Sequence, residues 1–192
     1  FCCAVTLYGI AMVYSVFLWR KGFQRDDWVV YGVLAGGLVL HTVAMAKRGF
    51  NLQACPINNL YEATAFIMWT IVAVNLVAGI WQRFRFVGAF ASPLLFVLGV
   101  FALFPDMDPE LANGAHEFSG ALSSLHKALL LLSFGGFGLS AVGAVMYLTQ
   151  EKDLKLHKFR AILSKLPPLE RLETAMTRLV WIAFGLLTAG LI

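Results

Sequence analysis

The sequence predicts an all-α protein, a polytopic membrane helix bundle with about six transmembrane helices and a short amphipathic cytoplasmic helix. Composition is the first observation behind this prediction. Of the 192 residues, 59% are hydrophobic and 14% charged, and the mean hydropathy is +0.75, far above that of soluble domains. The second is a set of nearly uncharged runs, each about as long as the 20 residues that cross the hydrocarbon core. They comprise residues 1–19, 28–46, 60–81, 86–104, 125–149 and 175–192.

The first run is interpreted as a span rather than a signal peptide, because Arg20 and Lys21 follow it without a cleavage pattern of small residues. It lacks a basic flank and a starting methionine, and the last run stops at Ile192 without a polar exit segment. We therefore expect residues 1–192 to form a single helical membrane domain that is a fragment of a longer chain. Pro93 is expected to kink the fourth run.

Small residues recur along one side of the fifth run, at Gly136, Ser140 and Ala144. Such a row allows close approach of another helix or of a flat ligand, and helix packing alone is the commoner use. Between the fifth and sixth runs, charges alternate with apolar residues at helical spacing until Pro167 and Pro168. This stretch predicts the amphipathic helix at the cytoplasmic surface.

The positions of lysine and arginine predict the orientation, since basic residues near span ends are retained in the cytoplasm. The basic connections 20–27, 82–85 and 150–174 are expected to be cytoplasmic, and the connections 47–59 and 105–124 to lie outside. The net charge of +4 then requires no nucleic acid, because basic loops beside an anionic membrane lipid surface account for it.

Four histidines are present, and His41 and His126 are the candidates for metal chemistry. His41 lies inside the second run and His126 begins the fifth, and an ionisable residue within a span is a functional hypothesis by default. Imidazole is a good axial ligand for haem iron. For His41, a hydrogen bond to a carbonyl or to a hydroxyl on another helix explains the residue equally well. For His126, contact with water at the membrane boundary is the simpler explanation, and His116 and His157 are expected to be surface residues.

The segment "CPINNLYEATAFIMW", residues 55–69, places polar residues at the start of an apolar run. Asn59 followed three positions later by Glu62 is a capping-box pattern, and Glu62 lies at the positive end of the helix dipole. Pro56 fixes the approach of the chain, while Tyr61 suits a membrane boundary and Trp69 an outer half-span. These residues alone predict a well-capped helix entrance that faces outward.

The three cysteines indicate little. Cys2 and Cys3 begin the first run, and Cys55 lies in an outer loop. A disulfide from Cys55 to either of them is geometrically conceivable in an oxidising compartment, but no spacing supports it. Whether any of the three is redox-active stays open.

The same segment resembles the Pro-x-x-Asn-x-Tyr-Glu-x-x-x-Phe-x-x-Trp motif of the CcsA (ResC, HemX-like) cytochrome c assembly proteins. The matching residues are Pro56, Asn59, Tyr61, Glu62, Phe66 and Trp69. The stretches "LHTVAMAKRGFNL", "LHKALLLLSFGGFGLSAVGAVMYL" and "LPPLERLETAMTRLVWIAFGLLTAGLI" resemble the family in the same order. The family's tryptophan-rich motif and both partner histidines are missing up to Ile192. The chain is therefore expected to be a truncated portion or, alternatively, a divergent relative that has lost the haem site.

The resemblance implies a membrane protein of cytochrome c biogenesis that carries haem b and presents it at the outer face for attachment to apocytochrome c. His41 and His126 resemble axial haem ligands that serve two different haem sites. A ResB-like membrane subunit and a thioredoxin-like reductant are the implied partners, in a bacterial inner (cytoplasmic) or thylakoid-type membrane. Any part in a haem-lyase (synthase) complex would be positional, because the sequence contains no evident pairing of nucleophile and base.

Two other functions were weighed. A non-catalytic structural or regulatory membrane subunit could use the same scaffold within a larger complex. A transporter is less well supported, because the spans lack paired carboxylates and broken-helix repeats. Which cytochrome is served, and the oligomeric state, are not predicted.

Overall fold

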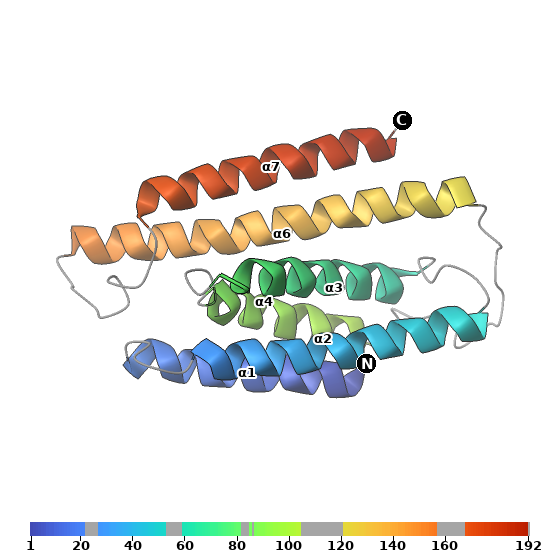
Figure 1. Ribbon diagram of the computed structural model, residues 1–192, viewed down its shortest axis with the longest axis horizontal. Coiled ribbons are helices and arrows are strands. Elements are labelled where there is room, and N and C mark those ends of the chain that lie inside the picture. Colours follow the sequence, from blue (N-terminus) through green and yellow to red (C-terminus); the bar gives the residue numbers. More distant parts are fainter. Residues whose placement is uncertain are drawn as a thin grey trace.

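The structure is a computed structural model that describes residues 1–21, 27–52, 59–81, 85, 87–104, 121–156 and 168–191. All regular secondary structure in these ranges is α-helical, which confirms the predicted fold class. The helices are α1 (Cys2–Lys21), α2 (Asp27–Leu52), α3 (Leu60–Gly79), α4 (Val87–Ala102), α6 (Ala121–Lys155) and α7 (Leu169–Leu191) (Figure 1).

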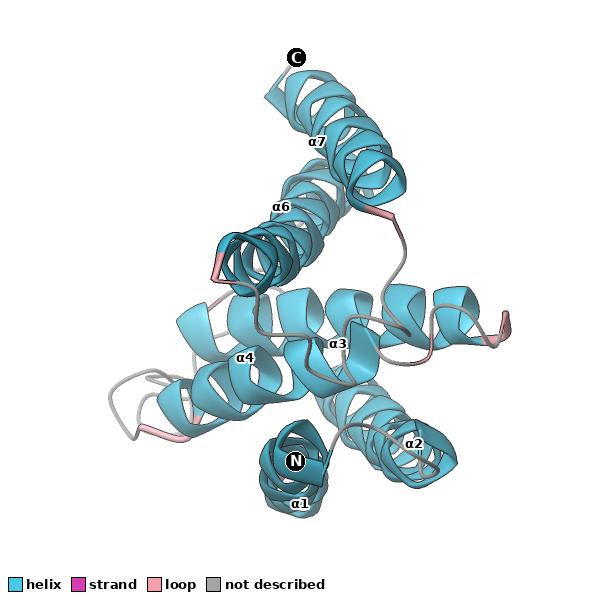
Figure 2. Ribbon diagram, turned by 90° about the vertical axis from the view of Figure 1, so that its left-hand side faces the viewer, coloured by secondary structure: helices cyan, strands magenta, loops and turns pink. Residues whose placement is uncertain are grey.

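The helices are stacked in layers (Figure 2). α1 and α2 lie side by side in one outer layer, and α3 and α4 cross the middle. α6 packs on the other face of this middle layer, and α7 lies on the outside of α6. The chain runs up and down, so that α1, α3 and α6 begin at one end of the bundle, where α2 also ends (Figure 1). We call this the N-terminal end and the other the opposite end.

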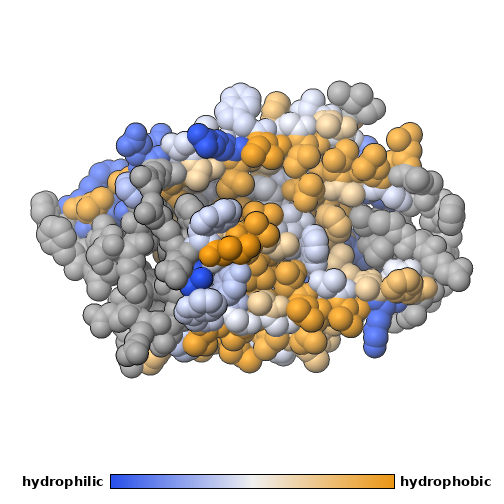
Figure 3. Space-filling model, viewed as in Figure 1, coloured by the Kyte–Doolittle hydropathy of each residue, from blue (hydrophilic) through white to orange (hydrophobic). Residues whose placement is uncertain are grey.

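The core lies where the middle layer meets its neighbours. Its largest fully buried apolar side chains come from five helices. They are Tyr8, Leu34, Met68, Ile71, Leu95 and Met146. α7 adds little to this core, since it packs almost entirely on α6 and leaves large apolar side chains such as Trp181 and Phe184 exposed. On the face drawn in Figure 3, exposed apolar residues also form a band across the middle of the molecule, and hydrophilic residues gather mainly toward the opposite end.

This apolar band identifies an integral membrane protein. In the described part of the chain, α2, α3, α6 and α7 are long and apolar enough to cross a membrane. The apolar parts of the other two helices, Cys2–Phe17 and Val87–Ala102, are shorter. Sixteen residues of α4 rise about 24 Å, less than the roughly 30 Å of a hydrocarbon core. α4 continues as one helix through Pro93.

Several helices extend beyond the predicted spans. α2 continues to Leu52, α6 ends only at Lys155, and α7 begins at Leu169, so parts of the predicted loops 47–59 and 150–174 are helical. Hydropathy stops a predicted span at the first charged residues, whereas helical hydrogen bonding continues through them, aided by the Glu151–Lys155 pair at 2.7 Å. The first residues of the predicted amphipathic helix, 150–155, continue α6, and the part after Leu156 lies outside the described residues.

The small residues of α6 serve helix packing. A Cβ added at Gly136 would lie 3.0 Å from the Cβ of Ala183 on α7, and one at Gly135 would lie 2.5 Å from Thr70 Cγ2 on α3. Ser140 Oγ also donates to the Met176 carbonyl oxygen at 3.5 Å. The small-residue side of α6, which could also have bound a flat ligand, is therefore in contact with α3 and α7.

This packing predicts that Gly135→Val destabilises the bundle by about 1–3 kcal/mol, because the new side chain overlaps Thr70. Gly185→Val on α7 is the matched control, since no atom of the described residues lies within 4 Å of its added Cβ. Thermal unfolding in detergent measures both variants. Equal losses would contradict the assigned α3–α6 contact.

Candidate functional site

The candidate site lies at the N-terminal end of the bundle and is built on the start of α3. Asn59 has extended backbone angles (φ −132°, ψ 171°) and is the N-cap, and its Oδ1 accepts a hydrogen bond from the Glu62 backbone N–H at 2.7 Å. The half of the predicted capping box in which Asn59 accepts from the first turn is thus confirmed. The Asn59 cap fixes the first turn of α3, from which the Tyr61 and Glu62 side chains project.

Glu62 also pairs with α2, which the sequence analysis did not predict. Arg48 Nε donates to Glu62 Oε1 at 2.5 Å. The Glu62 side chain is 1% exposed and that of Arg48 22%, so the carboxylate is the more deeply buried partner. Arg48 Cζ lies 4.9 Å from the centroid of the Tyr61 ring, in cation–π geometry. The sequence signal for this pair was the basic Arg48 just after the second apolar run and the acidic Glu62 at the start of the third.

His41 lies two turns before Arg48 on α2 and is fully buried. Its Nδ1 lies 3.2 Å from the Tyr8 hydroxyl of α1, which is fully buried as well. The Phe1 ring meets the imidazole edge to face, with ring centroids 5.1 Å apart. Within the described residues, Nε2 has no hydrogen-bond partner. Such an orphaned buried nitrogen is rare in proteins, and an ordered water or a bound ion would satisfy it.

A small recess lies beside the Phe1 ring, which contacts this histidine. Phe1, Ala44, Met45, Arg48, Tyr61, Glu62 and Ala65 line it. Its interior volume is about 10 Å³, which accommodates about one water molecule. The Phe1 ring also packs on Tyr61, with centroids 5.1 Å apart, and so closes the space between α1 and α3.

Trp69 connects α2 and α3 a little further along. Its Nε1 donates to Thr42 Oγ1 at 2.9 Å, and the Thr42 hydroxyl donates to the Leu38 carbonyl oxygen at 2.8 Å. Thr42 follows His41 directly, so this bond fixes the rotation of α2 at the histidine. Trp69 thus has a structural contact within the site as well as a place in the sequence motif.

Comparison with known proteins assigns the chain to a family. A family model described as cytochrome C assembly protein matches residues 57–192, which is well over half of the chain. The chain belongs to the cytochrome c assembly protein family. The match begins just before α3, so α3, α4, α6 and α7 lie within it and His41 precedes it.

Two of the relatives of this family member cover more of the chain than the family match does. Protein HemX of Brevibacillus brevis is 24% identical over 170 residues, which is 88% of this chain and 62% of the relative. Protein HemX of Bacillus subtilis (strain 168) is 23% identical over 169 residues, which is 88% of this chain and 61% of the relative. The cytochrome c biogenesis protein CcsA of Synechococcus sp. (strain JA-2-3B'a(2-13)) is 27% identical over 130 residues, or 66% of this chain and 36% of the relative. The chain thus spans less than two thirds of the length of these relatives. No solved structure matches it.

The structure does not bring the two candidate histidines of this cytochrome c assembly family member together. His126 is exposed near the start of α6, in the layer opposite α2 (Figure 2). The middle layer of α3 and α4 separates that layer from His41. Cys2 and Cys3 are exposed and free. Pro56, Cys55, His116 and His157 lie outside the described residues, and elsewhere no three His, Cys, Asp or Glu side chains cluster as a metal site would require.

The buried ion pair predicts an asymmetric response to mutation. Arg48→Met should cost about 3 kcal/mol of stability because it leaves the Glu62 carboxylate buried without its cation, and Glu62→Gln should cost less because Arg48 can reach solvent. The double variant should recover part of the Arg48→Met loss. Denaturation of the four proteins in detergent forms a double-mutant cycle, and additive losses would contradict a direct coupling. Lys155→Gln, which breaks an exposed pair, is the control and should have no measurable effect.

Proposed function

We propose that this cytochrome c assembly family member is a haem-handling membrane subunit of cytochrome c biogenesis. In this proposal it carries haem b and presents it at the outer face of the membrane for attachment to apocytochrome c. Family membership supports the process. The observation that supports haem handling by this chain is the fully buried His41, whose Nε2 has no partner among the described residues.

The chemistry of His41 suits haem iron. A neutral imidazole nitrogen is a common axial ligand, and a metal-bound histidine usually has its other ring nitrogen held by a hydrogen bond. Here the Tyr8 hydroxyl is 3.2 Å from Nδ1 and can hold the ring in that way. His41 would serve a site within the membrane and His126 a second site at the outer face, each with a different iron. Bound haem would supply the vinyl groups that react with cysteine thiols, while the protein holds and orients it.

The tight packing near His41 limits this proposal, since the nearby recess is lined by Phe1, which contacts His41, and not by His41 itself. The recess of about 10 Å³ is far below the roughly 300–1,000 Å³ of ordinary ligand pockets. Haem binding therefore requires the Phe1 ring to leave its contacts with His41 and Tyr61. The Arg48–Glu62 pair borders the same recess, so its charges would lie close to a bound porphyrin.

The orientation and the partners belong to the same proposal. The N-terminal end of the bundle, with the candidate site, would face outward, and the opposite end would be cytoplasmic, in a bacterial inner or thylakoid-type membrane. The helices would form one membrane domain that works with a ResB-like subunit and a thioredoxin-like reductant, in a complex with haem-lyase activity. The basic residues Lys152 and Lys155 at the opposite end support this orientation.

A structural or regulatory membrane subunit is the second candidate function. The closed packing of Phe1, Tyr61 and His41 favours it, because the described residues leave no room for a porphyrin without a rearrangement. In that case the orphaned nitrogen of His41 would be explained by an ordered water instead of iron.

Absorbance of the purified protein tests haem handling. Protein from haem-replete cells should show a Soret band. His41→Ala should lower the Soret absorbance per protein by the share of that band that comes from haem at the site within the membrane. His126→Ala should leave this share intact, because the middle layer separates the two histidines. Imidazole added to His41→Ala should restore part of the signal.

Val43→Ala is the matched control, two positions after His41 on α2. Val43 is an exposed side chain, and its truncation keeps both the Tyr8–His41 contact and the Trp69–Thr42 bond, so the Soret band should persist. Colourless wild-type protein, or a band unchanged in His41→Ala, would contradict the role of His41 and favour the structural subunit.

A further inference from the structure

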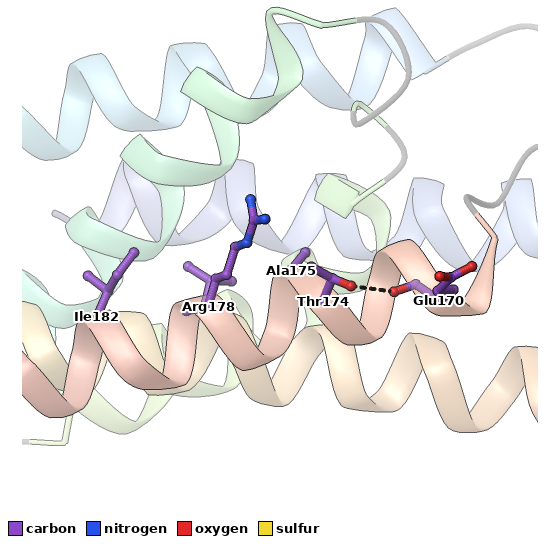
Figure 4. A pocket seen from close by; sticks show the side chains of 6 residues that line it. Glu170, Thr174, Ala175, Arg178 and Ile182 are labelled. Atoms are coloured by element: carbon purple, nitrogen blue, oxygen red, sulfur yellow. Dashed lines mark hydrogen bonds between the residues drawn. The ribbon is translucent and has the colours of Figure 1, made fainter.

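One face of α7 forms a groove that the proposed function does not use. α7 packs on α6 through residues such as Met176 and Ala183, which approach Gly143 and Gly136. The face beside this contact borders a groove of about 480 Å³ (Figure 4). The residues that line it are Glu170, Thr174, Ala175, Arg178, Leu179 and Ile182.

Arg178 is the main polar feature of this groove. It lies six residues after Leu172, where the apolar part of α7 begins, or about 9 Å along the helix. Its side chain is exposed, and it extends away from α7 and leans toward the Glu170 end (Figure 4). Among the described residues, Arg178 makes no hydrogen bond or ion pair. A guanidinium at this depth is costly in a membrane unless it reaches water or meets an anion.

The rest of the groove wall offers little to a polar ligand. The Thr174 hydroxyl donates its hydrogen to the Glu170 carbonyl oxygen at 2.8 Å (Figure 4). Glu170 lies eight residues before Arg178, about 12 Å along the helix, at the end of the groove. Ala175, Leu179 and Ile182 present hydrocarbon. The groove therefore combines a single cationic fork with an apolar track that leads toward the membrane interior.

We propose that this groove binds an anionic phospholipid, with its phosphate on the Arg178 guanidinium and an acyl chain along Leu179 and Ile182. A guanidinium fork matches phosphate oxygens in two parallel hydrogen bonds. A partner helix would instead need a carboxylate at this depth. The lipid site goes beyond haem handling and does not depend on it.

Native mass spectrometry of the protein, released from nanodiscs that contain equal amounts of phosphatidylglycerol and phosphatidylcholine, tests this proposal. The wild-type protein should retain phosphatidylglycerol in preference. Arg178→Gln should lower the ratio of retained phosphatidylglycerol to phosphatidylcholine by about fivefold, the effect expected for one basic residue. Arg178→Lys should keep part of the preference, because it keeps the charge without the fork.

Lys155→Gln is the matched control, because Lys155 is exposed at the same end of the bundle and lies outside the groove. It should leave the lipid ratio unchanged, and circular dichroism checks that every variant stays helical. The proposal is overturned if the wild-type protein retains both lipids equally, or if Lys155→Gln and Arg178→Gln lower the ratio alike. It is also overturned if Arg178→Gln leaves the ratio unchanged but releases a co-purifying membrane subunit, which would assign the groove to a partner helix.

Discussion

The buried ion pair between Arg48 and Glu62 holds α2 against α3, and the geometry of the candidate site depends on it. The capped first turn of α3 places Glu62 where Arg48 can reach it, and the Trp69–Thr42 bond fixes the rotation of α2 about two turns away. Together these contacts direct His41 toward α1. Removing the pair would therefore disturb both the recess and the histidine.

The opposite end of the same two helices is held by other means. Arg85 Cζ lies 3.8 Å from the centroid of the Trp28 ring, and Arg85 Nε donates to the Gly79 carbonyl oxygen. The Tyr31 hydroxyl donates to the Leu76 carbonyl oxygen. With α2 and α3 fixed at both ends, glycines on α6 let the third layer approach closely. α7 is the exception, since among the described residues it packs almost entirely on α6 and leaves much of its surface exposed. The groove beside Arg178 lies on this exposed helix.

The sequence predicted the features that depend on a single segment of the chain. Six apolar runs correspond to six described helices, the Asn59 cap is formed as expected, and the family motif at Tyr61 and Glu62 led to the right family. The contacts between helices were not predictable in the same way. The Tyr8–His41 and Arg48–Glu62 pairs depend on how each helix is rotated about its axis, and hydropathy carries little information on that rotation. Helix ends were also misplaced, because hydrogen bonding continues through charged turns such as the one that ends at Lys155.

The central claim is that His41 is held by Tyr8 at Nδ1 and keeps Nε2 available for iron. Nitrogen-15 NMR of histidine-labelled protein, with His41→Ala used to assign the signal, measures this most directly. The account predicts a neutral ring with its proton on Nδ1, an unprotonated Nε2, and a change of the Nε2 signal when haem is added. A proton on Nε2, or an Nε2 signal that haem does not alter, would contradict it.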